Sequence, residues 1–248
     1  MGYGWFENFP HLHMKNRIMK TYKINAIIIG ALFIFTMLAG MIDAYFVAPV
    51  FKNPITNIPQ IDDTLLLGVF SVLIMAIGIV FIAITFFPVV KKHSESIALT
   101  YVILRTIECL LLILGSICYL YIFALGGESI HGADASKYAI AIFLALKIKY
   151  YGYQLAMIVL GFGSLFLCYS LYESRVIPRF LSIWGGIGYI LLLLSAVLDI
   201  CGLIDTTNGF GAVLYVPGGL WELIVFPLWL FIKGFNFPLK DAIEGSLQ

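Results

Sequence analysis

The chain has 248 residues, of which 61% are hydrophobic and only 12% are charged, and its mean hydropathy is +0.99. This composition excludes an ordinary soluble domain, and the net charge of +1 gives no bias toward nucleic acid as a partner. The apolar residues come in repeated runs of about twenty, the length of a membrane-spanning helix. Because these runs are continuously apolar, where strands of a membrane barrel would alternate, the sequence predicts an all-α, polytopic membrane protein.

Six apolar segments follow one another between two polar ends. An aromatic and basic leader covers residues 1–23, and we expect it at the cytoplasmic face or the membrane interface. The predicted transmembrane domain covers residues 24–235, with helices at about 24–47, 64–90, 97–123, 150–172, 180–204 and 214–232. The fourth apolar segment is unusually long. Either one tilted helix begins outside the bilayer, or a separate interfacial helix over 138–149 precedes the span, and we favour the second. A mostly polar tail over 236–248 ends the chain.

The distribution of basic residues predicts the orientation, because lysine and arginine favour cytoplasmic loops. In a six-helix arrangement one side holds Lys15, Arg17, Lys20, Lys23, Lys91, Lys92, Arg175, Arg179, Lys233 and Lys240. The opposite connectors hold Lys52 and Lys137, joined by two lysines of the fourth segment if these reach the interface. An odd number of helices would scatter this bias, so we predict six helices and two cytoplasmic termini.

Three charged residues fall near the predicted membrane midplane. Arg105 and Glu108 lie three apart in the third segment, so they share a helix face, and Glu222 lies at a similar depth in the sixth. Charges at that depth cost several kcal/mol in lipid, so we expect them inside the bundle. If the two helices adjoin, Arg105 can bridge both carboxylates. The trio is either a structural ion-pair network, which its near balance of charge favours, or a polar ligand site or proton relay.

A second charged group is predicted near the outer membrane boundary. It consists of Asp43, Lys147, Lys149 and Asp199. Its charges balance, and interfacial anchoring is the ordinary behaviour of such side chains. A polar site is the alternative interpretation.

Several chemistries lack the residues they need. The four histidines, His11, His13, His93 and His131, all lie outside the predicted spans, so haem ligation by histidine and histidine-based metal catalysis lack ligands within the bilayer. We expect no metal and no cofactor. Walker, GxSxG and HExxH motifs are absent from the sequence. The four cysteines read as buried packing residues; nothing argues for a bond between Cys118 and Cys201, and nothing excludes one.

Three stretches resemble the DUF4386 family of bacterial membrane proteins. They are FFPVVKKHSESIALTYVILRTIECLLLIL, LYESRVIPRFLSIWGGIG and WELIVFPLWLFIKGFN, and the resemblance extends over residues 24–237. The matching positions are Lys92, His93, Glu95, Ser96, Arg105, Glu108, Pro178, Arg179, Trp184, Gly185 and Glu222. The leader before Met14 and the lysines at 147 and 149 depart from the pattern. The resemblance implies a multi-pass protein of the bacterial inner membrane, without an assigned activity.

We expect the bundle to enclose a polar-lined pocket that binds a small amphiphile, a lipid or a quinone-like molecule. The evidence is the midplane trio, the 15% aromatic content and a set of glycines that permit close helix packing or a cavity: Gly161, Gly163, Gly185, Gly186 and Gly188. A non-catalytic partner subunit or regulator of a membrane complex is the alternative. A carboxylate-based intramembrane enzyme or a proton-coupled transporter comes third, so an enzyme is left open but not favoured. The residues Lys92, His93 and Glu95 form a further candidate site on the cytoplasmic connector.

Overall fold

A computed structural model describes residues 8–52, 63–127, 135–206 and 209–236. Their helices are α1 (Asn8–Lys52), α2 (Asp63–Val90), α3 (Glu95–Gly127), α4 (Ala135–Ser174), α5 (Arg179–Ile200), the 3₁₀ turn η2 (Phe210–Tyr215), α6 (Val216–Leu220), the π-helical turn η3 (Trp221–Val225) and α7 (Phe226–Ile232). Within the described residues, six stretches are long and apolar enough to cross a membrane, the last of them running through η2, α6, η3 and α7. We call this stretch the last crossing. The prediction of an all-α protein with six transmembrane helices is confirmed; the orientation of its termini stays a prediction.

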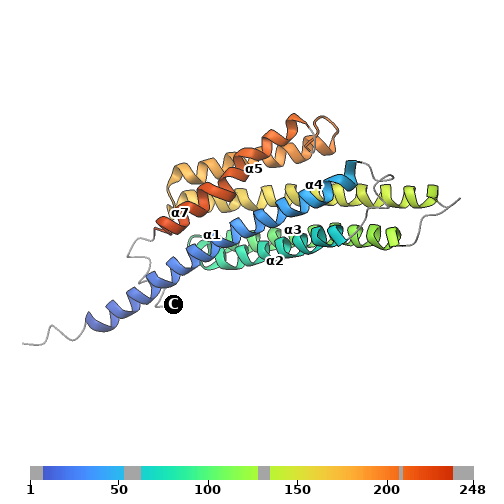
Figure 1. The fold of residues 1–248 in the computed structure, drawn as a ribbon. Coiled ribbons are helices and arrows are strands. Elements are labelled where there is room, and N and C mark those ends of the chain that lie inside the picture. Colours follow the sequence, from blue (N-terminus) through green and yellow to red (C-terminus); the bar gives the residue numbers. More distant parts are fainter. Residues whose placement is uncertain (1–7, 53–62, 128–134, 207–208, 237–248) are drawn as a thin grey trace, which may run out of the picture.

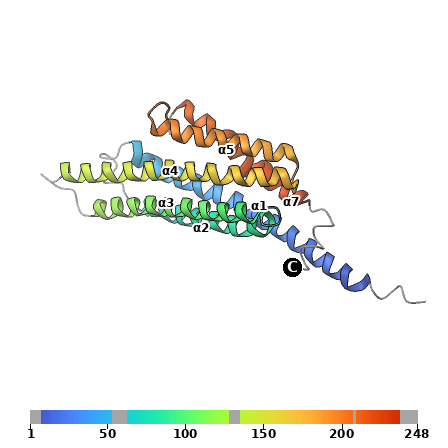
Figure 2. The ribbon, with the colours of Figure 1, turned by 180° about the vertical axis from the view of Figure 1, so that it is seen from behind.

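The helices form a ring. Each of α1 to α5 packs on the next along the chain, α5 packs on the last crossing, and α7 with η3 packs back on α1. In Figure 1 and from behind in Figure 2, α2 and α3 make one side, α5 and the last crossing the other, and α1 and α4 lie between them. A ring of six helices leaves an interior that each helix can reach with one face.

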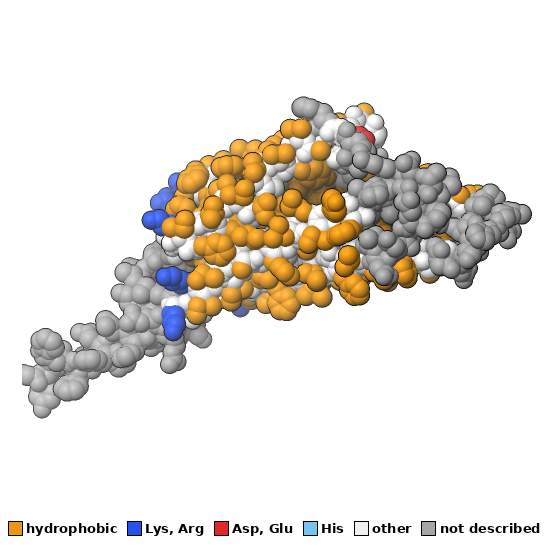
Figure 3. All heavy atoms as spheres, viewed as in Figure 1, with side chains coloured by type: hydrophobic (Ala, Val, Ile, Leu, Met, Phe, Trp, Pro, Cys, Tyr) orange, Lys and Arg blue, Asp and Glu red, His pale blue; other side chains and the backbone are white. Residues whose placement is uncertain are grey.

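The outer surface of the ring is apolar, as a helix in lipid requires. Figure 3 shows hydrophobic side chains over most of the visible face, with lysines and arginines gathered at one end. At this end, Lys92 lies over the Tyr22 ring at 4.4 Å and the amide of Asn236 donates to the Val176 carbonyl. We call it the basic end and the opposite one the far end.

An aromatic core closes the ring toward the basic end. Trp221 stacks on Phe226 at 4.2 Å between ring centroids, and Phe33 meets the two rings edge-on at 6.1 and 5.5 Å. The Trp221 indole N–H donates to the Leu181 carbonyl at 2.8 Å, so this fully buried ring satisfies its polar atom. The core thus ties α1 to α5 through the last crossing.

Helix α4 corrects one expectation. It is a single helix of 40 residues, so the predicted break between an interfacial helix over 138–149 and a span from 150 is wrong. The physical reason is local: no glycine or proline interrupts the sequence between Ala135 and Tyr151, and Lys149 is mostly buried against the interior rather than lying at an interface.

Four of the five glycines singled out in the sequence serve close packing; the fifth, Gly186, has only Cys168 near it, at 4.0 Å. A Cβ atom at Gly188 would lie 2.7 Å from the Cα of Gly218, and one at Gly185 would lie 2.8 Å from the Trp221 ring. Only glycine allows α5 and the last crossing to approach so closely. The glycines that line the interior, Gly40, Gly218 and Gly219, are different ones.

Helix α1 begins at Asn8, so its first residues belong to the predicted leader. The side chains of the leader up to residue 19, and the tail over 237–248, lie outside the described residues.

Candidate functional site

A cavity of about 660 Å³ fills the middle of the ring. It follows α1 from Phe33 to Ala44 and α4 from Lys149 to Leu160, and it also touches α2, α3, α5 and the last crossing. Eleven residues of α-helix rise about 16 Å, so the cavity runs along roughly half the hydrocarbon thickness of a bilayer. Its volume lies in the range of sites that hold a drug-sized molecule.

Arg105 and Glu108 stand together at the cavity, as the sequence predicts. Nη1 of Arg105 donates to Oε2 of Glu108 at 2.8 Å, and only 3% and 1% of the two side chains are exposed. The guanidinium also lies over the Tyr101 ring at 5.6 Å. Its Nε has no hydrogen-bond partner within the described part of the chain. The pair is therefore desolvated and lies on α3 alone, and the Nε donor of Arg105 stays unused among the described residues.

Glu222 reaches the same cavity from another wall. It lies in η3, which packs on α1 and α5, and its carboxylate accepts a 2.6 Å hydrogen bond from the Tyr189 hydroxyl. In the described part of the chain, the ion pair of Arg105 goes to Glu108 alone. The bridge from Arg105 to both carboxylates is therefore not formed, because the ring sets α3 and η3 on different walls.

The backbone around Glu222 is unusual. The residues Trp221–Val225 form a π-helical turn, in which the amide of Phe226 reaches back to the Trp221 carbonyl. Pro227 follows; it has no amide hydrogen for the carbonyl four residues before it, and its ring would crowd that carbonyl in a regular helix. Such turns are rare and recur at functional sites.

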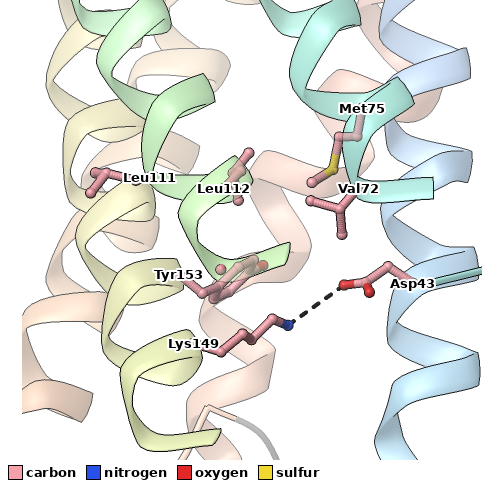
Figure 4. A pocket seen from close by; sticks show the side chains of 8 residues that line it. Asp43, Val72, Met75, Leu111, Leu112, Lys149 and Tyr153 are labelled. Carbon is pink, nitrogen blue, oxygen red and sulfur yellow. Dashed lines mark ion pairs between the residues drawn. The ribbon is translucent and has the colours of Figure 1, made fainter. Parts of the chain in front are cut away.

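The far end of the cavity holds a second ion pair. Nζ of Lys149 lies 3.6 Å from Oδ2 of Asp43, across the ring from α4 to α1. Figure 4 shows the two side chains pointing toward one another beside Tyr153, Met75 and Leu112. They also line a side pocket of about 10 Å³, which is room for one water. Oδ1 of Asp43 has no partner among the described residues, so a water there would satisfy it.

Asp199 is held by neutral partners. Its Oδ2 accepts hydrogen bonds from the Gln154 amide and from the Thr206 hydroxyl, the latter at 2.6 Å, and Tyr215 donates to Gln154 at 3.3 Å. Lys147 is exposed on α4 and lies over the Phe143 and Tyr150 rings at 5.7 Å. The four charges predicted as one outer group are thus an ion pair, a hydrogen-bonded aspartate and a separate lysine.

Sequence reasoning missed the neutral members of the site. Gln154, Thr206 and Tyr215 line the cavity, and Tyr189 binds Glu222. Gln154 could have been found from the sequence, because it is the one glutamine within the six apolar segments. The methionines could also have pointed to the cavity: all those after residue 19 line it, namely Met37, Met41, Met75 and Met157.

The connector residues lie away from the cavity. Lys92, His93 and Glu95 are exposed at the basic end between α2 and α3, and Glu95 pairs with Lys91 at 2.8 Å. In the described residues, all four cysteines are free and no group of three or more metal-ligating side chains gathers. The cavity is therefore the stronger of the two candidate sites.

Comparison with known proteins gives a family and nothing finer. Searches of curated proteins and of solved structures returned no match. A family model described as a domain of unknown function, DUF4386, matches residues 28–234, which include all six crossings except the first residues of α1. The chain therefore belongs to the DUF4386 family of membrane proteins.

Proposed function

We propose that this protein binds a small amphiphilic molecule, such as a lipid or a quinone-like compound, inside its helix ring. The observation that supports this function best is the cavity itself, which has a volume of about 660 Å³ and an apolar wall along its length. It has charged side chains at two levels: Arg105, Glu108 and Glu222 at one, and the Asp43–Lys149 ion pair at the other. A ligand with an apolar body and a polar head matches such a lining. A partner subunit or regulator, the alternative function, has no need of a hollow interior.

The cavity is open beside α1. Met41 lines it and is nevertheless 55% exposed, and Ala44 is exposed as well. The half of α1 nearer the basic end packs on α7 and η3, with Gly30 against Phe231 and Phe33 against Trp221. At Gly219, a Cβ atom would meet nothing closer than Met37 at 3.9 Å. Figure 3 shows a hollow toward the far end of this face, among apolar side chains. We propose that the ligand enters here from the lipid phase.

The charge distribution supports a location and an orientation for this activity. The lysines and arginines at the basic end fit a cytoplasmic face, and the family resemblance fits the bacterial inner membrane. In that orientation the opening of the cavity faces the outer leaflet.

A glycine at the cavity wall offers the test. Gly219→Leu would place its side chain in the cavity, because only Met37 lies within 4 Å of the new Cβ. Gly186→Leu is the matched control: it lies on α5, its nearest neighbour is Cys168 at 4.0 Å, and it does not line the cavity. Native mass spectrometry of protein purified from membranes should show a bound small molecule on the wild type and on Gly186→Leu, and loss of it on Gly219→Leu. Equal ligand on all three, or none on any, would contradict the proposal.

A further inference from the structure

The charged groups at the cavity do not balance. Its ionisable lining, apart from tyrosines, consists of three acids and two bases: Asp43, Glu108, Glu222, Arg105 and Lys149. Asp43 pairs with Lys149 and Glu108 pairs with Arg105. Glu222 remains, and its hydrogen bond comes from the neutral hydroxyl of Tyr189. A fourth acid, Asp199, lies just behind Gln154 and Thr206 and is held by these neutral groups.

An isolated carboxylate inside a membrane protein is costly, and a positive charge beside it removes much of that cost. Within the described residues no lysine or arginine lies within 4 Å of Glu222. Arg105 acts on Glu222 only from a greater distance and is already paired with Glu108, so the lining holds one carboxylate more than its two bases can pair. A cationic ligand would supply the missing charge. An anionic ligand would meet three acids and two bases that are already engaged, so the lining selects for the sign of the ligand's charge.

The remaining wall fits an apolar body of variable shape. Four methionines line it, and their unbranched, polarisable side chains adapt to different partners. The rings of Phe33, Tyr153 and Tyr215 also line the cavity, and aromatic rings attract organic cations.

We propose that the ligand class is lipophilic organic cations: molecules with one positive charge and a large apolar body, whose charge lies against Glu222 and whose body lies along the methionines. This inference rests on the proposed function and specifies the chemistry of the same cavity.

Two ions of nearly the same shape and opposite charge give the test. Tetraphenylphosphonium and tetraphenylborate each carry four phenyl rings on one central atom. Equilibrium binding of radiolabelled ions to the full-length protein in lipid nanodiscs, with empty nanodiscs subtracted, measures both affinities. We expect the phosphonium to bind at least ten-fold more tightly than the borate. Glu222→Gln should weaken phosphonium binding at least ten-fold, whereas Glu173→Gln, an exposed glutamate near the end of α4, should leave it unchanged.

The comparison of the two ions on the wild type needs no variant, so it stands even if Glu222→Gln fails to fold. Equal binding of the two ions, tighter binding of the borate, or an unchanged affinity in a folded Glu222→Gln protein would overturn the cationic assignment. If neither ion binds while mass spectrometry still finds a ligand that Gly219→Leu removes, the assignment fails and the proposed function stands. If neither ion binds and no ligand is found, both fail.

Discussion

The Tyr189 hydroxyl donates a 2.6 Å hydrogen bond to the carboxylate of Glu222, and this contact joins α5 to the one acid at the cavity that has no basic partner within the described chain. It depends on the neighbouring glycines. Gly188 precedes Tyr189 and meets the backbone of Gly218 four residues before Glu222, so the close approach of the two backbones sets the hydrogen bond. The contact that packs α5 on the last crossing therefore also positions the Glu222 carboxylate at the cavity.

The close approach gives the first prediction. Gly188→Ala puts a Cβ atom 2.7 Å from the Cα of Gly218, where backbone has to move, so the melting temperature in detergent should fall by several degrees. Gly186→Ala, two residues away, meets only Cys168 at 4.0 Å and should not lower it. Equal melting temperatures for the two variants would mean that α5 and α6 are farther apart than described.

Arg105 should be needed for stability because its removal would leave the buried Glu108 carboxylate without its partner. Arg105→Met strands Glu108, of which 1% is exposed, and should lower the free energy of unfolding by about 3–5 kcal/mol. The double variant Arg105→Met, Glu108→Leu removes both charges and should recover most of that loss. Arg179→Met, an exposed arginine over Tyr172, serves as the control and should change little. Thermal unfolding in one detergent compares the stability of the wild type with that of the three variants. A loss of stability in the double variant as large as in Arg105→Met alone would contradict the account.

Two lysines on α4 should differ although they are two residues apart. Lys149 pairs with Asp43 and 14% of its side chain is exposed, whereas Lys147 is on the outside. Lys149→Met should therefore lower the melting temperature clearly. Adding Asp43→Asn to Lys149→Met should restore part of the lost melting temperature, because it removes the acid left without a partner. Lys147→Met should leave the melting temperature nearly unchanged. Comparable losses for both lysines would show that Lys149 faces outward.

Labelling tests the orientation that the basic residues predict. Cys201 is exposed just after α5 at the far end, and His93 is exposed at the basic end. In intact cells a membrane-impermeant maleimide should modify Cys201, and in a Cys201→Ser background it should not modify a His93→Cys variant until the membrane is opened. Labelling of His93→Cys but not of Cys201 in intact cells would show that the orientation is the opposite of the predicted one.

The features that could be predicted from the sequence are those that depend on residues close together in the chain. The apolar runs fix six crossings, and the spacing of Arg105 and Glu108 fixes their contact, because both lie on one helix face. Contacts between helices depend on the order of the ring, which spacing does not encode. The pairing of Asp43 with Lys149 and of Glu222 with Tyr189 therefore needed the structure. The continuity of α4 is a local feature, and the lack of glycine and proline between Ala135 and Tyr151 already pointed to it.

A ligand in the cavity between Glu222 and the methionines should be visible in an experimental density map of the protein in lipid, at a resolution that separates side chains. We expect continuous non-protein density in the ring, with its body along Met37, Met75 and Met157 and one end within 4 Å of the Glu222 carboxylate. A ring packed shut at this level, or a cavity that holds only separate water peaks, would contradict it.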